Sequence, residues 1–488
     1  MAYLALDLGA GSGRAIAGTI KDDKILLQEV HRFNNTPVKL GDTLYWNFLS
    51  LFANVKEGIR LAVKQGYDLK GVAVDTWGVD FGLIDSSGKL LSNPVCYRDF
   101  RTAGMSDYSK KYISVEEFYE ITGIQQMEIN SVFQLLSLNL TPDPTLTIAE
   151  KLLFTPDLIN YFLSGVACNE YTIASTSQLL DAGKRQWNKG IFEKLSLKYS
   201  LMSDIVHPGE VLGKLKDDIE LETGAVDAKV FAVGSHDTAS AIAAIPAEGD
   251  DWAFLSSGTW SLLGVLSDEP VLTEEARKSD FTNEGGVDNK ILFMRNITGL
   301  WLLQRLIAEW NKQDDKDYSY EYLLAECRKC EAFRSIVDSD HSDFNNPVSM
   351  MEAIQDYCKK TRQYVPQSKG ELVRCVLESL AVKYYFVMQR LQECTDRQIN
   401  KIFIVGGGSQ NETLNQFIAN ALNMEVVVGL TEGTAIGNIM QQAIANHEVD
   451  DWKEVRRIIR NSFDLKSYYP EDTDFWKKNI DKNSHLFL

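Results

Sequence analysis

The sequence has fewer basic than acidic residues. Its 488 residues include 50 lysines and arginines against 68 aspartates and glutamates, which gives a formal net charge of −18. A surface with this balance does not in general attract the phosphates of nucleic acids or of anionic lipids. We therefore expect neither a nucleic-acid partner nor a membrane partner. A small phosphorylated ligand stays compatible with the charge, because local backbone dipoles can hold an anion.

Cysteine, proline and long apolar runs are also scarce. The 7 cysteines lack regular spacing, so they predict no disulfide framework, and the Cys327–Cys330 pair has no second pair to complete a zinc site. No apolar run approaches the roughly 20 residues that cross a bilayer. The first apolar run contains Asp7 and follows no basic segment, unlike a signal peptide. These absences predict a cytoplasmic protein.

The composition that remains is typical of an ordered globular chain. Hydrophobic residues make up 44% of the sequence and prolines number only 11, so disorder is not expected. A chain of this length has room for two or three domains with full cores.

The order of expected strands and helices indicates an α/β fold. Residues 3–8, 14–20 and 25–33 form apolar or alternating segments that predict three strands. Residues 48–66 carry apolar side chains at helical spacing, and residues 71–77 form a buried type of strand. Three strands, a helix and a further strand are the opening of an α/β domain.

The second half begins with the same architecture, although its sequence is not a repeat of the first. Strands are expected at residues 252–257 and 260–266, and a long helix at residues 372–392. A strand at residues 401–405 and a helix from Asn411 follow, separated by a glycine run.

We place a domain boundary at Pro246, after an apolar helix. It gives an N-terminal domain of residues 1–246 and a C-terminal domain of residues 247–488. Two similar α/β domains that face each other leave a cleft, which is the usual place for a ligand.

The glycine-rich turn at residues 9–14 is the first candidate binding element. A dinucleotide-binding loop would need a glycine where Arg14 stands and would open a helix, whereas the following residues alternate as a strand. A P-loop is excluded because no Gly-Lys-Ser/Thr follows. A glycine-rich hairpin lets backbone N–H groups approach phosphate oxygens, and Asp7 could hold Mg²⁺ through water beside them. Taken alone, a hairpin turn without a ligand explains the segment equally well.

Two further glycine-containing turns strengthen the phosphate interpretation. Ser257-Gly258-Thr259 forms a small-residue turn at the start of the second half, and Gly406-Gly407-Gly408-Ser409 lies between a strand and a helix. Each of the three turns follows the carboxyl end of a predicted strand, where α/β proteins bind nucleotides.

Asp237 is the candidate catalytic base. It lies between a strand at residues 229–234 and a helix at residues 239–245, so a helix N-cap is the best explanation when it is taken alone. The alternative is a carboxylate kept ionised by the helix dipole, ready to accept a proton from a hydroxyl during phosphoryl transfer. The two roles could coexist.

The segment Asp75-Thr76-Trp77-Gly78-Val79-Asp80-Phe81 is the candidate sugar wall. Trp77 could stack on the C–H face of a sugar while Gly78 offers backbone hydrogen bonds. A buried tryptophan in a turn is an equal alternative. Asn296, at a strand-to-helix junction, is either a cap or a sugar ligand.

Together these residues resemble the FGGY family of carbohydrate kinases over essentially the full chain. The resemblance is carried by residues 7–14, 75–81, 97–99, 175–180, 234–238, 257–261, 296–299 and 405–411. The Asp75–Phe81 segment is its most specific part, because related kinases have other residues on this substrate-facing strand. One departure is Gly11, where close members tend to have serine.

The resemblance implies two actin/hexokinase/Hsp70-like, ribonuclease H-like α/β domains that flank a nucleotide and sugar cleft. It also implies transfer of the γ-phosphoryl group of ATP, with Mg²⁺, to the 1-hydroxyl of L-rhamnulose, by a monomer or homodimer. Asp237 would be the proton acceptor, and the sugar contacts would be Trp77, Gly78, Asp80, His236 and Asn296. The expected ATP contacts are Ala10, Gly11, Ser12, Gly13, Arg14, Gly258, Thr259, Gln304 and Gly407.

Two other functions stay open on the sequence. The acceptor could be another ketose such as L-fuculose, because wall residues distinguish epimers poorly. The chain could also be a non-catalytic, actin-like nucleotide switch, which would have no use for Asp237 and a polar sugar wall. An NAD-dependent oxidoreductase is excluded by the strand that follows the first glycine turn.

Overall fold

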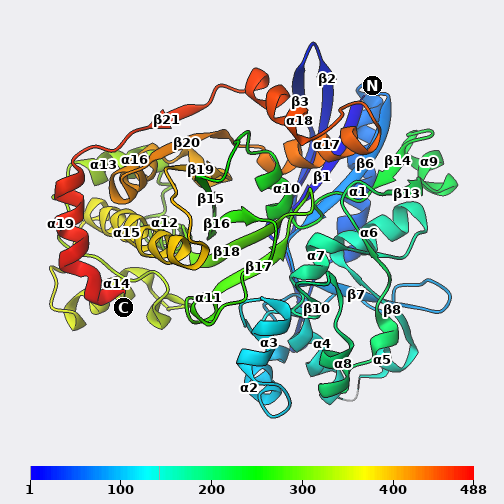
Figure 1. Cartoon of the computed structure of the whole chain (residues 1–488), viewed down its shortest axis with the longest axis horizontal. Helices are drawn as coiled ribbons and strands as arrows, with labels where there is room; N and C mark the ends of the chain where they lie inside the picture. Colours follow the sequence, from blue (N-terminus) through cyan, green and yellow to red (C-terminus); the bar gives the residue numbers. More distant parts are fainter. Residues whose placement is uncertain (1, 142, 488) are drawn as a thin grey trace. The chain divides into compact units, whose positions relative to one another are not determined.

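The computed structural model describes residues 2–141 and 143–487, and strands alternate with helices along most of the chain (Figure 1). Packing divides it into two units, which are described separately. Unit 1 comprises Met1–Ala247, Leu266–Phe293 and Glu432–Phe463. Unit 2 comprises Glu248–Val265, Met294–Thr431 and Asp464–Leu488.

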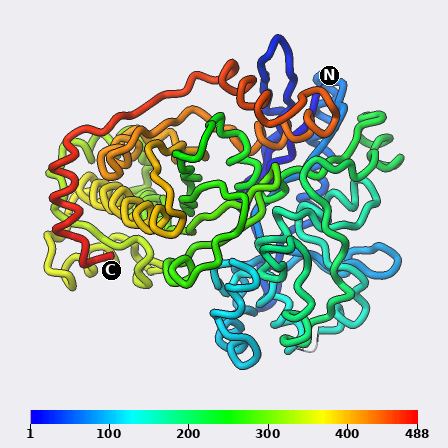
Figure 2. Tube along the Cα trace, in the orientation of Figure 1, coloured from blue at the N-terminus to red at the C-terminus, as the bar shows by residue number. Residues whose placement is uncertain are grey.

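The main sheet of unit 1 has the strand order β13-β14-β6-β1-β2-β3. Its strands are β1 (Ala2–Leu8), β2 (Ser12–Lys21), β3 (Lys24–Asn34), β6 (Leu69–Thr76), β13 (Val211–Lys214) and β14 (Lys229–Phe231). Strand β1 pairs with β2 in antiparallel and with β6 in parallel orientation, so the strands predicted near the N-terminus are confirmed. Figure 2 traces the β2–β3 hairpin in blue as a long arm.

Helices cover this sheet. These helices are α1 (Phe48–Lys64), α6 (Thr155–Ser164), α9 (Asp217–Thr223), α10 (Asp237–Ala243), α17 (Gly433–Ala445) and α18 (Trp452–Ser462). Every residue of β1 is buried, as expected for a strand whose neighbours and faces are all covered. Helix α1 turns Leu51, Val55 and Ile59 inward, which is the spacing that predicted it.

Shorter elements complete unit 1. The strands are β4 (Val38–Leu40), β5 (Thr43–Tyr45), β7 (Phe81–Asp85), β8 (Ala149–Phe154), β9 (Asn169–Glu170), β10 (Leu180–Asp181), β11 (Gln186–Trp187), β12 (Ile205–Val206) and β17 (Phe281–Gly285). The helices are α2 (Met105–Ser109), α3 (Val115–Thr122), α4 (Ser131–Leu140), α5 (Pro144–Ile148), α7 (Tyr171–Ser175), α8 (Lys189–Lys194) and α11 (Glu274–Lys278).

The second large sheet has the strand order β17-β18-β16-β15-β19-β20-β21, and all of its strands except β17 lie wholly or mostly in unit 2. These strands are β15 (Trp252–Ser257), β16 (Trp260–Ser267), β18 (Ile291–Thr298), β19 (Lys401–Val405), β20 (Glu425–Leu430) and β21 (Lys466–Tyr468). The helices of unit 2 are α12 (Trp301–Asp314), α13 (Tyr320–Arg328), α14 (Met350–Lys360), α15 (Lys369–Thr395), α16 (Glu412–Leu422) and α19 (Thr473–Asn483). Helix α15 begins with a capping box made by Ser368 and Glu371.

The predicted repeat of architecture is confirmed by the strand orders. In each sheet the first strand pairs with the second in antiparallel orientation and with a later strand in parallel orientation. The order β3-β2-β1-β6-β14 in one sheet therefore corresponds to β18-β16-β15-β19-β20 in the other. Among the described residues, none of the helices is long and apolar enough to span a membrane.

Candidate active site

The turn between β1 and β2 is held open by its own backbone and by one asparagine. The Asn35 side chain donates to the Gly9 carbonyl at 2.9 Å, and its backbone N–H donates to the Gly11 carbonyl at 3.1 Å. A Cβ on Gly11 would meet nothing within 4 Å, so the serine typical of close family members would also fit. A Cβ on Gly13 would lie 2.2 Å from the Phe33 ring, so this position requires glycine.

Charged side chains gather beside this turn. The β-sheet register places Arg14 opposite Asp7 and Asp75 on the other side of Asp7. Arg14 forms ion pairs with both Asp7 and Glu432, at the start of α17. Asp75 is fully buried, and its one bonded oxygen accepts from the Asn438 amide at 2.6 Å. Burial and the nearby Asp7 carboxylate raise the pKa of Asp75 well above its usual range.

Asp237 is the first residue of α10, and the N-cap is His236. The expectation that Asp237 caps the helix is therefore wrong: its carboxylate lies inside the first turn and contacts the Thr238 hydroxyl at 3.2 Å. A third of its side chain, 33%, stays exposed. Burial raises the pKa of Asp237, His236 lowers it and Asp7 raises it, with a net rise. An exposed carboxylate of raised pKa is suited to accept a proton.

The Asp80 side chain holds the turn that follows β6 and carries Gly78. This carboxylate is buried and accepts hydrogen bonds from the indoles of Trp46 and Trp77, the Tyr97 backbone and the Gln134 amide. Trp77 is 7% exposed, and its ring lies 4.3 Å from that of Trp46, centroid to centroid. The side chains of Trp77 and Asp80 are thus buried in the interior, next to the loop that contains Gly78.

Val79, next to Gly78, has a strained backbone. Its φ is 66°, a left-handed conformation that a β-branched residue rarely adopts. The Ser131 hydroxyl donates to its carbonyl at 2.6 Å and its N–H donates to the Thr176 hydroxyl at 3.1 Å, so two neighbours hold it in place. Strain of this kind concentrates at functional sites.

Three of the residues predicted to contact the nucleotide lie in unit 2, together with the residues that hold them in place. The Thr259 hydroxyl donates to the Gln304 amide oxygen at 2.9 Å, which ties the β15–β16 turn to α12. A Cβ on Gly408 would lie 2.1 Å from the Ser257 hydroxyl, whereas one on Gly407 would meet nothing within 4 Å. The glycine run therefore passes close to the same turn and leaves Gly407 open.

Gly258 and Asn296 lie in this part of the chain as well. The Gly258 carbonyl accepts from the Leu300 N–H at 2.9 Å, at the start of α12. Asn296 lies in β18, two residues before Thr298, whose N–H donates to Asp340 at 2.8 Å. The predicted strand-to-helix junction is thus confirmed as the end of β18 and the beginning of α12.

We expect Thr259→Ala to weaken ATP binding. Loss of the hydroxyl frees the turn from Gln304, so the backbone amides of residues 258 and 259 are less well ordered before ATP binds. The KM for ATP should rise by about threefold to tenfold, the equivalent of one hydrogen bond, with kcat nearly unchanged. Steady-state kinetics at saturating sugar measure both constants, and Thr259→Ser should restore the wild-type value.

Sequence reasoning missed Glu284, Glu432 and Gln134. Glu284 lies in β17 with its Oε2 atom 3.2 Å from Nδ1 of His236. Nothing local in the sequence marks these three residues, because each contacts the site from a distant part of the chain.

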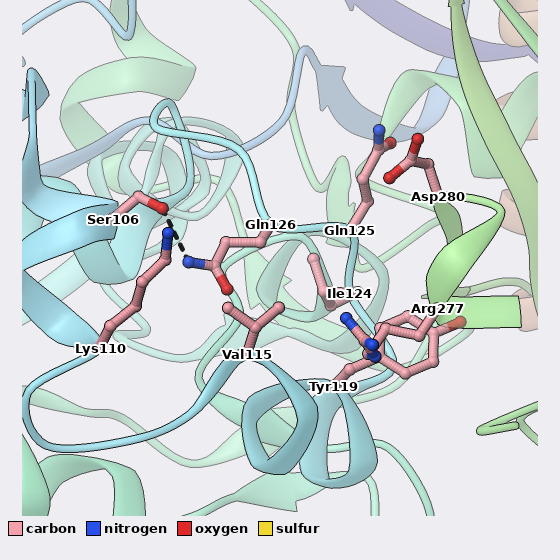
Figure 3. Close-up of a pocket in the computed structure, with 9 residues that line it drawn as sticks. All are labelled: Ser106, Lys110, Val115, Tyr119, Ile124, Gln125, Gln126, Arg277 and Asp280. Carbon is pink, nitrogen blue, oxygen red and sulfur yellow. Dashed lines mark hydrogen bonds between the residues drawn. The ribbon is translucent and has the colours of Figure 1, made fainter. Parts of the chain in front are cut away.

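A pocket of about 250 Å³ in unit 1 has none of the predicted site residues in its lining (Figure 3). Its lining is Ser106, Lys110, Val115, Tyr119, Ile124, Gln125, Gln126, Arg277 and Asp280. Across residues 2–141 and 143–487, no three His, Cys, Asp or Glu side chains are grouped so as to hold a metal ion.

Comparison with known families identifies the class of protein. Residues 2–244 match the N-terminal domain, and residues 253–446 the C-terminal domain, of the FGGY family of carbohydrate kinases. The chain belongs to this family and is a phosphotransferase that acts on a carbohydrate.

Several of its sequence relatives are named rhamnulokinase. A rhamnulokinase of Bacteroides thetaiotaomicron is 42% identical over 97% of each chain. A rhamnulokinase of Oceanobacillus iheyensis is 40% identical over 95% of this chain and 97% of its own. One of Bacillus subtilis is 36% identical over 97% of this chain and 96% of its own.

Solved structures of more distant kinases have the same fold. A ligand-bound xylulose kinase from Lactobacillus acidophilus matches with a TM-score of 0.82 at 16% identity, over 99% of this chain and 97% of its own. A Plasmodium falciparum glycerol kinase with ADP matches with a TM-score of 0.80 at 15% identity, over 100% and 97%.

Proposed function

We propose that this protein is a cytoplasmic kinase that transfers the γ-phosphoryl group of ATP to the 1-hydroxyl of L-rhamnulose. The products are L-rhamnulose 1-phosphate and ADP, and the reaction serves the use of L-rhamnose. The observation that carries the proposal is the partly exposed Asp237 carboxylate beside His236, in a chain 42% identical to a rhamnulokinase over nearly its full length.

Asp237 accepts the proton of the sugar hydroxyl. The hydroxyl oxygen forms a bond to the γ-phosphorus as the bond from that phosphorus to the β-phosphate oxygen breaks, and ADP leaves. A carboxylate whose pKa is raised by burial binds this proton more strongly than a fully solvated one.

The backbone amides of residues 10–13 and the Arg14 guanidinium bind the phosphates. The Gly11 position has open space next to it, so a phosphate oxygen can approach the amide without a steric clash. Arg14 already has two carboxylate partners, and binding ATP would give it a phosphate partner in exchange. Gly258, Thr259, Gln304 and Gly407 of unit 2 contact the rest of the nucleotide.

Asp7 fits a Mg²⁺ ion held mainly by water and phosphate oxygens. Magnesium commonly takes one or two carboxylates and completes its coordination with water and substrate, so a protein cage of three carboxylates is not required. The buried Asp75 Oδ1 atom, beside Asp7 in the sheet register, has no hydrogen-bond partner among the described residues and is an orphaned polar group at this point. When bound, the ion neutralises charge on the phosphates.

His236, Gly78 and Asn296 bind the ketose hydroxyls. Trp77 and Asp80 influence sugar binding indirectly, because their hydrogen bond fixes the loop that contains Gly78. This arrangement lets the wall select among ketoses through the position of Gly78 as well as through direct contact.

The test is ADP release from Mg·ATP with L-rhamnulose, L-fuculose, L-xylulose, D-xylulose and glycerol. We expect the highest kcat/KM with L-rhamnulose. A preference for L-fuculose or another polyol would keep the kinase and overturn the assignment of the wall residues. Folded protein that binds ATP but releases no ADP with any sugar would favour a nucleotide switch.

A further inference from the structure

Glu284 contacts the residue next to the proposed base from a separate strand. Its carboxylate is nearly buried, with 9% of the side chain exposed, and the His236 ring is 10% exposed. Glu284 Oε2 lies 3.2 Å from His236 Nδ1, but the two atoms are not aligned for a good hydrogen bond. Among the described residues neither atom has another hydrogen-bond partner, so the two face each other as an ion pair when the imidazole is protonated.

The backbone on both sides of Glu284 is anchored. Asn283 N–H donates to the Gly123 carbonyl at 2.8 Å, and Gly285 N–H donates to the Ser175 hydroxyl at 2.7 Å. All five residues of β17 are buried. The Glu284 carboxylate is thus presented by a rigid strand and does not depend on a mobile loop.

The His236 backbone is anchored as firmly. Its N–H donates to the Thr172 hydroxyl at 3.1 Å, and the preceding N–H, of Ser235, donates to Glu170 Oε2 at 3.2 Å. Glu170 also accepts from the Thr172 hydroxyl at 2.6 Å, so one buried carboxylate organises this segment. The His236 ring is fixed between Glu284 at Nδ1 and Asp237, whose Oδ1 lies 3.6 Å from Nε2.

We infer that Glu284 is a positioning residue for phosphoryl transfer, which keeps the proton on His236 Nδ1 and directs Nε2–H toward Asp237 and the sugar. The catalytic role of Glu284 rests on the proposed function. The protonation of the His236 imidazole, however, can be measured without any substrate. Glu284 touches neither the base nor, in this assignment, the ketose: it acts through His236.

The charged groups around Glu284 and His236 agree with this role. Glu284, Asp237 and Glu170 face His236; burial alone lowers the pKa of His236, but these carboxylates raise it overall. His236, when protonated, in turn lowers the pKa of Asp237 against the opposite influence of burial and Asp7, and the Asp75 carboxyl, whose own pKa is raised, is a further titratable group nearby. Without Glu284, His236 would lose its proton at lower pH and Asp237 would hold its proton to higher pH.

The variant that tests this role is Glu284→Gln, which keeps the shape of the side chain and removes its charge. We expect the pKa of His236 to fall by about one unit, and the acid limb of the kcat/KM profile to move about half a unit toward higher pH. On the acid limb kcat/KM should then fall by up to about threefold, with a smaller loss at pH 8. Glu284→Asp keeps the charge on a shorter side chain and should give intermediate shifts.

Imidazole NMR titration of the full chain, labelled with ¹⁵N-histidine, measures the first shift directly. The protein has 6 histidines, so His236→Asn identifies the signal by its loss. Glu309→Gln is the matched control, because Glu309 is a hydrogen-bonded carboxylate that caps α14 in unit 2. It should leave the His236 titration unchanged.

An unchanged His236 pKa in both Glu284 variants, with wild-type thermal unfolding, would overturn the inference. If Glu284→Gln does not fold, Glu284→Asp alone decides through the same titration. Failure of the wild-type enzyme to phosphorylate any ketose would overturn the proposed function separately, since the titration does not use the sugar.

Discussion

Asp237→Asn is expected to lower kcat by at least ~10²-fold, the usual contribution of a general base. The amide has nearly the same shape as the carboxylate, but it cannot accept the hydroxyl proton. Because Asp237 does not cap α10, the helix loses no capping bond, and the free energy of unfolding should change little. ATP affinity should also stay near the wild-type value, since the phosphate-binding turn is untouched.

The measurement is sugar-dependent ADP release, with ATP binding followed by calorimetry. Asp217→Asn is a matched control because Asp217 is likewise the first residue of a helix, α9, whose N-cap is the preceding residue. It should keep full turnover. Wild-type turnover in Asp237→Asn would show that another group takes the proton, and equal losses in both variants would point to a general effect of helix charge.

The main strands could be predicted from sequence because each carries a continuous or alternating apolar pattern. Strands β15 and β19 begin and end at the predicted residues, and α16 begins one residue after its predicted start at Asn411. The strand expected at residues 229–234 is shorter, ending at Phe231, because its last apolar residues leave the sheet toward α10. Apolar character predicts burial, but it does not predict where hydrogen bonding to a neighbouring strand stops.

The sequence could indicate candidate site residues only where these residues follow one another in the chain. The turns at residues 9–14 and 257–259 are local patterns, so they could be found without a structure. Glu284 and Glu432 contact the site from strands and helices far along the chain, and the sequence holds no local sign of them. The strained φ of Val79 was also hidden, since valine is ordinary in a strand sequence and its conformation depends on Ser131 and Thr176.

The first unit concentrates carboxylates at its candidate site. Asp7, Asp75 and Asp237 influence one another, and burial and mutual repulsion raise the pKa of Asp75 and of Asp237. Arg14 and His236 are the cations that offset this charge. Such an arrangement favours binding of a cation with the phosphates, and it makes the charge state of His236 important for keeping Asp237 ionised.

Asp80→Ala should cost about 3–5 kcal/mol of unfolding free energy, the typical result of removing one partner from a buried charged network. Asp80 accepts from four donors: the indoles of Trp46 and Trp77 at 2.6 and 2.9 Å, the Gln134 amide at 3.0 Å and the Tyr97 N–H at 3.2 Å. The substitution leaves three of them without an acceptor, because the Gln134 amide keeps its bonds to the Ile129 and Val79 carbonyls. Burial raises the pKa of Asp80 and these donors lower it, with a net rise, so the hydrogen bonds offset only part of the cost of burying the carboxylate.

Urea unfolding followed by tryptophan fluorescence measures this loss, since two of the four donors are indoles. Asp80→Asn keeps one acceptor oxygen and should lose about half as much. Asp107→Ala, at an exposed ion pair with Lys110, should leave the midpoint unchanged. An unchanged midpoint in Asp80→Ala would mean that the donors find water instead. A lowered midpoint together with a raised KM for the ketose would tie the Asp80 network to the position of Gly78, and so to the choice of sugar.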